Sequence, residues 1–149
     1  MCRAIQISSI RVMPWVLRTP PPGNFQPGSV SLGSGGRITL RFTNNVLTGN
    51  GDTTADLHVF EVGSDVEDTF VEITKDGQEW HSVGKVFGAT DSIDIDAFGF
   101  TPSDEFSFVR LTDDPDEGGT TGETPGADID AVGAISAVAL YSDNYNSRW

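Results

Sequence analysis

Short segments in which apolar and polar residues alternate recur along the middle of the chain. In residues 37–43 three apolar side chains, Ile38, Leu40 and Phe42, alternate with arginine and threonine. A period of two residues is that of a β-strand with one buried face, so this segment predicts a strand. Residues 57–61 contain few polar positions and predict a second strand, which we expect to be buried more deeply.

A hairpin is predicted where two further strand-like segments meet at an Asp-Gly pair. Residues 69–75 and 79–87 flank the turn that contains Asp76 and Gly77. Asp-Gly between two such segments is a strong hairpin signal, because these residues tolerate the positive φ that tight hairpin turns require. We therefore expect the two segments to be antiparallel neighbours in one sheet.

The remaining strands are predicted from shorter patterns. Residues 92–98 alternate isoleucine with aspartate, and residues 106–111 form a mainly apolar segment. Residues 129–140 are a run of valine, alanine and isoleucine, which we expect to lie centrally in its sheet. Residues 44–56 and 112–127 are rich in glycine and small polar residues and predict loops.

About eight short strands, with no convincing helical period, predict an all-β fold, a two-sheet antiparallel β-sandwich of the jelly-roll type. The 149 residues fit a single domain. We place the sandwich at residues 29–140 and a C-terminal tail at residues 141–149. Residues 1–28 form an atypical N-terminal segment, with a weakly patterned strand at residues 4–17 and a proline-rich linker at residues 19–29.

Charge is distributed very unevenly along the chain. The net charge is −13, and all 22 Asp and Glu residues lie from Asp52 onward. Such a surface repels phosphate backbones, acidic polymers and anionic membranes, which argues against nucleic acid as a partner and favours divalent cations. A solvated acidic surface that keeps a secreted protein soluble explains the charge equally well.

Cysteine and hydropathy patterns restrict the class of protein further. Cys2 is the only cysteine, so neither an internal disulfide nor a thiolate metal cluster can form. No segment reaches the roughly 18 apolar residues that a membrane-spanning helix needs. Residues 1–17 are interrupted by Arg11 and Pro14 and lack a small-residue cleavage site, so they make a poor export signal.

Acid-rich loops are the main candidate sites, and their chemistry suits calcium. Ca²⁺ takes about six to eight oxygen ligands from carboxylates and loop carbonyls, whereas zinc prefers Cys and His. Asp52 and Asp56 lie in one such loop, and residues 113–117 form another, whose spacing does not fit an EF-hand and whose simpler interpretation is a solvated turn. Asp128 and Asp130 share one face of a strand that is just beginning, where we favour a cation over hydrogen-bonded structural aspartates.

Other polar and aromatic residues offer weaker hypotheses. Trp80 and His81 follow the predicted turn and could form a platform for a sugar ring, although burial of Trp80 in the core is the simpler interpretation. Arg110 interrupts an apolar strand and is expected to pair with a carboxylate, with direct recognition of a sugar or carboxylate as the alternative. Asp94 and Asp96 alternate with isoleucines and predict the polar outer face of one strand.

Catalytic motifs are missing from the sequence. His58 and His81 are the only histidines, and no nucleophile elbow, His-Glu-x-x-His helix or phosphate-binding loop is present. We therefore predict a protein that is not an enzyme. A carboxylate pair for glycoside hydrolysis is left open by the 22 acidic residues, although no pair stands out.

Several stretches, taken together, carry a family resemblance; they are residues 31–40, 56–61, 71–77 with Trp80, 109–113 and 126–132. They resemble a bacterial extracellular domain of multidomain surface proteins, found beside OmpA-like or cell-wall-anchoring modules and related to galactose-binding, discoidin-like jelly rolls. The resemblance covers about residues 29–136, and the N-terminal segment does not match it. It implies a structural calcium ion, with ligands drawn from Asp128, Asp130, Asp52, Asp56 and Glu61, and glycan binding by loops at one end.

These observations predict a calcium-binding, non-catalytic β-sandwich module of a surface or secreted bacterial protein, serving carbohydrate binding or adhesion. The alternative is a structural spacer or self-associating domain that has no small-molecule ligand. The expected partner is a glycan or another cell-surface ligand, outside the cell and without membrane insertion. A second copy of the chain is a further candidate partner, because a substituted first strand would leave an unpaired sheet edge.

Overall fold

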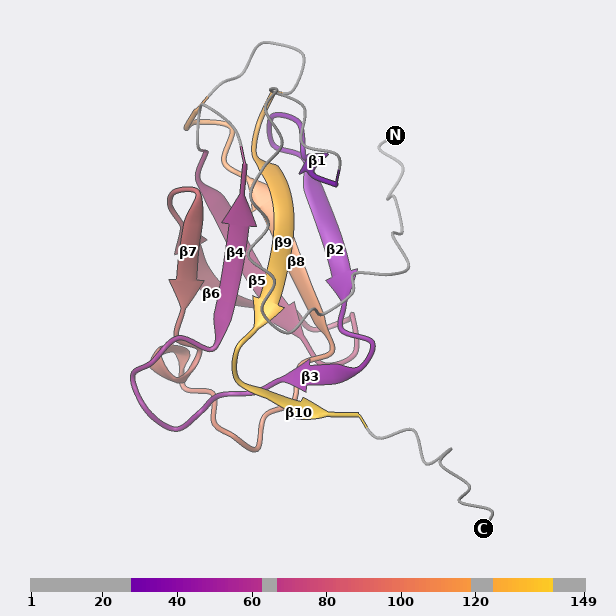
Figure 1. Cartoon of the computed structure of the whole chain (residues 1–149), viewed down its shortest axis with the longest axis vertical. Helices are drawn as coiled ribbons and strands as arrows, with labels where there is room; N and C mark the ends of the chain where they lie inside the picture. The colour runs from indigo at the N-terminus through magenta and orange to yellow at the C-terminus, as the bar shows by residue number, and fades with distance from the viewer. Residues whose placement is uncertain (1–27, 63–66, 119–124, 141–149) are drawn as a thin grey trace, which may run out of the picture.

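Two antiparallel four-stranded sheets pack face to face, and a small two-stranded sheet lies across one end of them (Figure 1). The computed structural model describes residues 28–62, 67–118 and 125–140. The strands and the single short 3-10 helix of these residues are β1 (Val30–Ser31), β2 (Arg37–Arg41), β3 (Asn45–Leu47), β4 (Leu57–Glu61), β5 (Thr69–Thr74), β6 (His81–Val86), β7 (Thr90–Ile93), η1 (Asp96–Phe98), β8 (Phe108–Asp113), β9 (Asp128–Ala134) and β10 (Ala137–Ala139).

The strand order is that of a jelly roll. One main sheet has the order β1-β9-β4-β7 and the other has the order β2-β8-β5-β6. Among these eight strands, neighbours in the sequence lie in opposite sheets, except for β5 and β6. The chain therefore crosses repeatedly between the two layers, as in double-sheet jelly rolls. The all-β sandwich predicted from the alternation of apolar and polar residues is confirmed.

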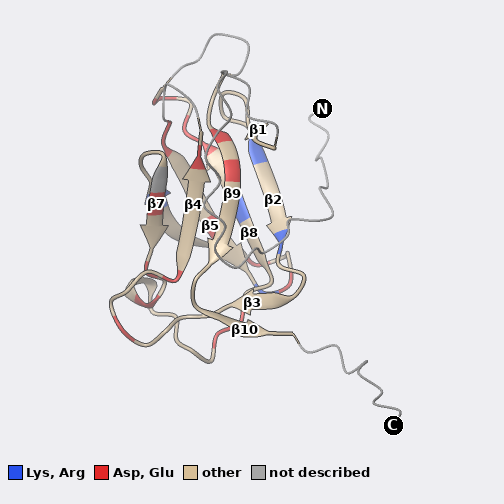
Figure 2. Ribbon diagram, viewed as in Figure 1, with Lys and Arg blue, Asp and Glu red and all other residues tan. Residues whose placement is uncertain are grey.

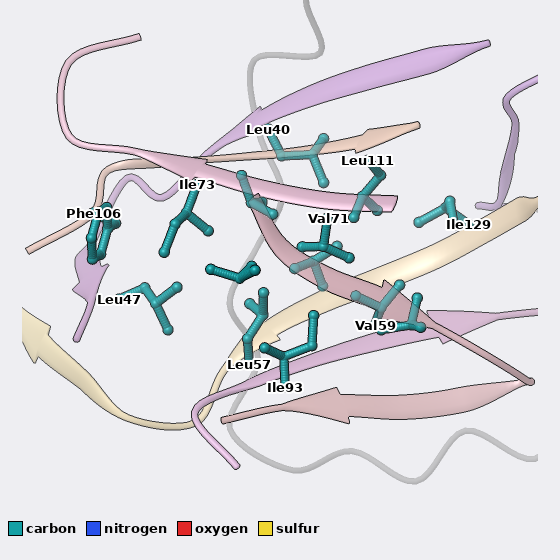
Figure 3. Close-up of a cluster of buried hydrophobic side chains, with 14 of the residues drawn as sticks. Leu40, Leu47, Leu57, Val59, Val71, Ile73, Ile93, Phe106, Leu111 and Ile129 are labelled. Carbon is teal, nitrogen blue, oxygen red and sulfur yellow. The ribbon is translucent and has the colours of Figure 1, made fainter. Parts of the chain in front are cut away.

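Side chains from the inner faces of both sheets form one hydrophobic core (Figure 3). Leu57, Val71, Phe106 and Leu111 are fully buried within it. Strand β2 alternates between exposed and buried residues along its whole length, as its sequence predicts. Burial of one large apolar side chain contributes roughly 1.5–3 kcal/mol, so this core is the main source of stability.

The predicted hairpin is present, with a longer connection than its Asp-Gly pair suggests. Strands β5 and β6 pair antiparallel, and β6 begins at His81 rather than at Glu79. Asp76 accounts for the difference, because its Oδ1 accepts a hydrogen bond from the N–H of Gln78 at 2.8 Å. Gly77 follows with a φ of 82°, which glycine adopts without strain.

Two segments differ from their predicted structures. Residues 44–56, predicted as a loop, contain strand β3, which pairs with β10. Residues 92–98, predicted as one strand, leave the sheet after Ile93 and form helix η1. The strand ends there because the N–H of Ile95 donates to the side chain of Asp56 instead of to a neighbouring strand.

The C-terminal apolar run divides into two strands. Strand β9 lies between β1 and β4, in the central position predicted for it, and β10 then turns away to pair with β3. The predicted N-terminal strand at residues 4–17, nearly all of the linker and the tail at residues 141–149 lie outside the described residues. In the part of the chain that is described, no helix has the length and apolar character to cross a membrane.

Candidate functional site

Three aspartates from two segments meet at the end of the sandwich where β4 begins. Asp56 immediately precedes β4, whereas Asp94 and Asp96 follow β7. Because β4 and β7 pair antiparallel, with Leu57 opposite Ile93, the start of one strand lies beside the end of the other. One carboxylate oxygen from each aspartate lies within 4.8 Å of the others. We refer to these three residues as the aspartate triad.

Asp56 is the buried member of the triad. Its side chain is 0% exposed, and its Oδ2 accepts a hydrogen bond from the N–H of Ile95 at 2.9 Å. Its Oδ1 is also buried and has no hydrogen-bond partner among the described residues. The pKa of Asp56 is raised to about 6, chiefly by burial; the charges of Asp96 and Asp94 contribute to the rise, and the hydrogen bond from the Ile95 N–H opposes it. A buried, unpaired carboxylate oxygen is costly unless a proton or a cation satisfies it.

Asp96 is held by the loop that precedes Asp56. Its carboxylate accepts hydrogen bonds from the N–H of Asn50 at 2.9 Å and from the N–H of Gly51 at 3.2 Å. Gly49 passes so close that an added Cβ would lie 2.8 Å from Oδ2 of Asp96. A larger residue at this position would push the Asp96 carboxylate away from the loop, so glycine lets the loop wrap closely around it.

The backbone of Asp56 connects the triad to the small sheet. Its carbonyl oxygen accepts hydrogen bonds from the N–H of Ile135 at 2.6 Å and of Ser136 at 3.2 Å, just before β10. The hydroxyl of Ser136 donates in turn to the carbonyl of Gly49 at 3.1 Å. The triad thus lies where three otherwise separate segments converge.

The five residues predicted as calcium ligands do not form one cluster. Asp56 belongs to the triad, while Glu61 lies at the opposite end of β4. Asp52 is exposed, and its Oδ1 accepts hydrogen bonds from the N–H and the hydroxyl of Thr54, both at 2.7 Å. Asp128 is half-buried and Asp130 is exposed, both in β9.

Glu61 forms part of a second buried acidic pair. Its Oε1 accepts a hydrogen bond from the N–H of Glu67 at 3.1 Å, and both side chains are nearly inaccessible to solvent. Burial raises the pKa of Glu61 to about 7, and the adjacent Glu67 carboxyl contributes to the rise. Gly118 packs directly on this pair, since a Cβ there would lie 2.1 Å from Cγ of Glu67. The Glu61 carboxyl therefore keeps its proton up to near neutral pH.

The acidic segment 113–117, for which a solvated turn was the simpler interpretation, is partly buried. Asp113 accepts hydrogen bonds from the N–H of Gly35 and the N–H of Ala127, each at 2.8 Å. Asp114 forms an ion pair with Lys85. These two carboxylates join the loops at the end of the sandwich opposite the triad, where Figure 2 also shows acidic residues.

Trp80 and Arg110 lie together on the outer face of a sheet, and His81 points away from them. The guanidinium of Arg110 lies 4.0 Å from the centre of a Trp80 ring, so the interpretation of Trp80 as a core residue is wrong. Arg110 also forms the carboxylate pair expected of it, with two hydrogen bonds of 2.7 Å to Glu72. This pairing lowers the pKa of Glu72. The ring of His81 packs inward, with its centre 5.4 Å from that of Phe100.

Asp94 and Asp96 were missed as site residues because their pattern resembles the exposed face of a strand. Both are half-buried beside Asp56, in a segment that has left the sheet. The Asp-x-Asp spacing after an apolar strand is the only sequence signal for them. Which carboxylate they meet depends on the pairing of β4 with β7, and that pairing has no local sequence signature.

Comparisons with known proteins do not identify a family for this chain. No protein-family model, no curated protein and no solved structure matches the chain. The resemblance to discoidin-like surface domains therefore stays a prediction.

Proposed function

We propose that this protein is a non-catalytic β-sandwich module that binds calcium at the aspartate triad. The observation that carries the proposal is the buried Oδ1 of Asp56, which has no hydrogen-bond partner among the described residues and lies in a cluster of three carboxylates. A cation bound among these oxygens would satisfy that atom and offset the repulsion between the carboxylates.

Calcium suits this site better than the other common cations. The triad offers oxygen atoms only, which excludes the Cys and His ligation typical of zinc. Ca²⁺ accepts irregular sets of carboxylate, carbonyl and water oxygens, whereas Mg²⁺ demands near-octahedral geometry and keeps its waters. The site is built from loop segments of different elements, which favours the more adaptable ion.

The bound ion would act as a structural cross-link. It would join the start of β4 to the segment after β7, and through Asp96 it would restrain the loop at Asn50 and Gly51. Loops held in this way can present a constant surface to a partner. This supports the role predicted from the sequence, a binding or adhesion module of a surface or secreted bacterial protein.

A spacer or self-associating domain is the alternative function. Both functions need the same cation site, and they differ only in whether a ligand surface exists elsewhere on the sandwich. A ligand-binding measurement therefore decides between them.

The cation site is tested by thermal unfolding of EDTA-treated protein, with and without Ca²⁺. At the affinities typical of extracellular modules, about 10 mM Ca²⁺ should stabilise the native state by about 1.4–2.7 kcal/mol. For a chain of this length that is a rise in Tm of several degrees. Asp56→Asn should abolish the rise, because the amide removes the charge and one ligand oxygen while keeping an acceptor for Ile95.

Asp52→Asn is the matched control, because Asp52 lies on the same loop but is exposed and outside the triad. We expect this variant to keep the full response to Ca²⁺. An equal response in both variants would show that any calcium effect arises elsewhere, and an equal response to Mg²⁺ would contradict a calcium site. Absence of any shift in the unmodified protein would end the proposal.

A further inference from the structure

Basic side chains gather on the outer face of the β2-β8-β5-β6 sheet, in spite of the acidity of the chain. Strand β2 turns Arg37 and Arg41 to solvent, and Thr39 between them pairs with Arg110 of β8. Residues that pair directly across a sheet point to the same side, so Arg110 shares the face of the β2 arginines. Figure 2 shows these positions in blue on β2 and β8.

The register of β5 completes this face. Phe70 pairs with Thr112 on one side and Lys85 on the other, and Lys85 lies 5.0 Å from the Phe70 ring centre. The face therefore carries every Lys and Arg of the described residues except Lys75, which pairs with Asp104 instead. We define the basic face by Arg37, Arg41, Arg110 and Lys85 with the rings of Phe70, Trp80 and Phe108.

Two of these cations are neutralised within the protein and two are not. Arg110 is bound to Glu72, and Lys85 pairs with both Asp68 and Asp114. Arg37 and Arg41 are exposed, and neither forms an ion pair with any residue that the structure describes. The charge available to a ligand therefore comes from the two arginines of edge strand β2.

Aromatic rings lie between and beside these charges. The guanidinium of Arg41 lies 5.6 Å from the ring centre of Phe108, and Arg110 stacks on Trp80. Phe70 is 41% exposed, and Phe87 at the end of β6 is 59% exposed. Exposed aromatic surface beside guanidinium groups matches a ligand made of apolar ring faces and carboxylate or sulfate groups.

The spacing of the arginines indicates an extended ligand. Four residues along a strand span roughly 13 Å, so one small anion cannot reach both Arg37 and Arg41. A polymer that carries anionic groups at intervals can contact both of them along β2. Nucleic acid fits poorly, because its charges follow each other at about 1.7 Å and would meet the acidic remainder of a chain with net charge −13.

We propose that the basic face binds an anionic polysaccharide, with Arg37 and Arg41 contacting its carboxylate or sulfate groups and the exposed ring of Phe70 packing against its sugars. The inference rests on the binding role proposed above and names its ligand class. It does not depend on the aspartate triad, which lies among loops at the end of the other sheet.

The test is binding of polygalacturonate, a carboxylate-bearing polysaccharide, measured by affinity electrophoresis in EDTA. EDTA removes calcium from both protein and polymer, so failure of the cation site and failure of this proposal are distinguishable. Neutral dextran and double-stranded DNA serve as comparison polymers. We expect retardation by polygalacturonate, weaker at higher salt, and none by dextran or DNA.

Two variants complete the test. The double change Arg37→Gln and Arg41→Gln should weaken binding by about tenfold, because two exposed charge contacts are lost. Lys75→Gln, which removes a cation outside the basic face, should leave the affinity within about twofold. Both variants alter exposed side chains, and circular dichroism would verify that they fold.

Several results would overturn the proposal. Unchanged polygalacturonate binding by the double variant would show that the arginines do not contact the polymer. Equal binding of dextran or tighter binding of DNA would show that the ligand class is wrong. Charged side chains also protect edge strands from pairing with other chains. If the unmodified protein bound no polysaccharide and the double variant aggregated, Arg37 and Arg41 would have that protective role instead.

Discussion

The buried pair of Glu61 and Glu67 should make the stability of the fold fall as the pH rises. The change that isolates this effect is Glu61→Gln. Glutamine has nearly the same shape, can still accept the hydrogen bond from the Glu67 N–H and can donate one to the Glu67 carboxylate. It differs from the native side chain chiefly in having no proton to lose.

The magnitude follows from the raised pKa of Glu61, which is about 7 against an ordinary 4.5. The folded state binds the proton more tightly than the unfolded state, so the stabilisation is complete below pH 4.5 and is lost as the pH rises to about 7. Each pKa unit corresponds to about 1.4 kcal/mol, which gives a loss of roughly 2–3 kcal/mol between pH 5 and pH 8. Glu61→Gln should lack this loss and should therefore be the more stable protein at pH 8.

Urea unfolding at several pH values between 5 and 8 measures the effect. The difference in unfolding free energy between variant and native protein should change by about 2–3 kcal/mol over this range. Glu105→Gln, an exposed substitution of the same type, should show no such change. Parallel pH profiles for the native protein and Glu61→Gln would refute the raised pKa of Glu61.

Two further predictions concern packing. Gly49→Ala should destabilise the protein by roughly 1–3 kcal/mol and weaken its response to Ca²⁺, because the new methyl group displaces the Asp96 carboxylate. Differential scanning calorimetry with and without Ca²⁺ measures both effects, and an unchanged profile would contradict the close approach of Gly49 to Asp96. Phe106→Ala should cost roughly 3–5 kcal/mol in urea unfolding, because Phe106 is fully buried against Phe100; a cost below about 1 kcal/mol would show that the core relaxes around the cavity.

Elements whose pattern is set within a few residues were predictable from the sequence. Strand β4 has the bounds expected from its apolar run, and the β5–β6 hairpin follows from the segments flanking Asp76 and Gly77. In these cases the local hydrophobic period and the three-dimensional environment agree, because one face of each strand is buried.

Features that depend on distant partners were not predictable. Strand β3 lies in a glycine- and asparagine-rich segment and forms because distant residues pair with it, β10 from about 90 residues away and Phe106 through a bridge to Leu47. The aspartate triad depends in the same way on the pairing of β4 with β7. Trp80 was assigned to the core because tryptophan is usually buried, yet the stacked Arg110 covers it on an outer face.

The position of the last two long strands governs how this chain can fold. Among the described residues, β1 pairs with β9 and β2 with β8 and with no other strand, so both strands wait for partners that follow much later in the chain. Val30 meets Ile129 across a loop of about 100 residues, and contacts of such long range make folding slow. During translation, neither main sheet can close until β8 and β9 have left the ribosome. We therefore infer that β1 and β2 stay unpaired on the nascent chain until β9 and β8 have emerged, which leaves their backbone N–H and C=O groups exposed for that interval.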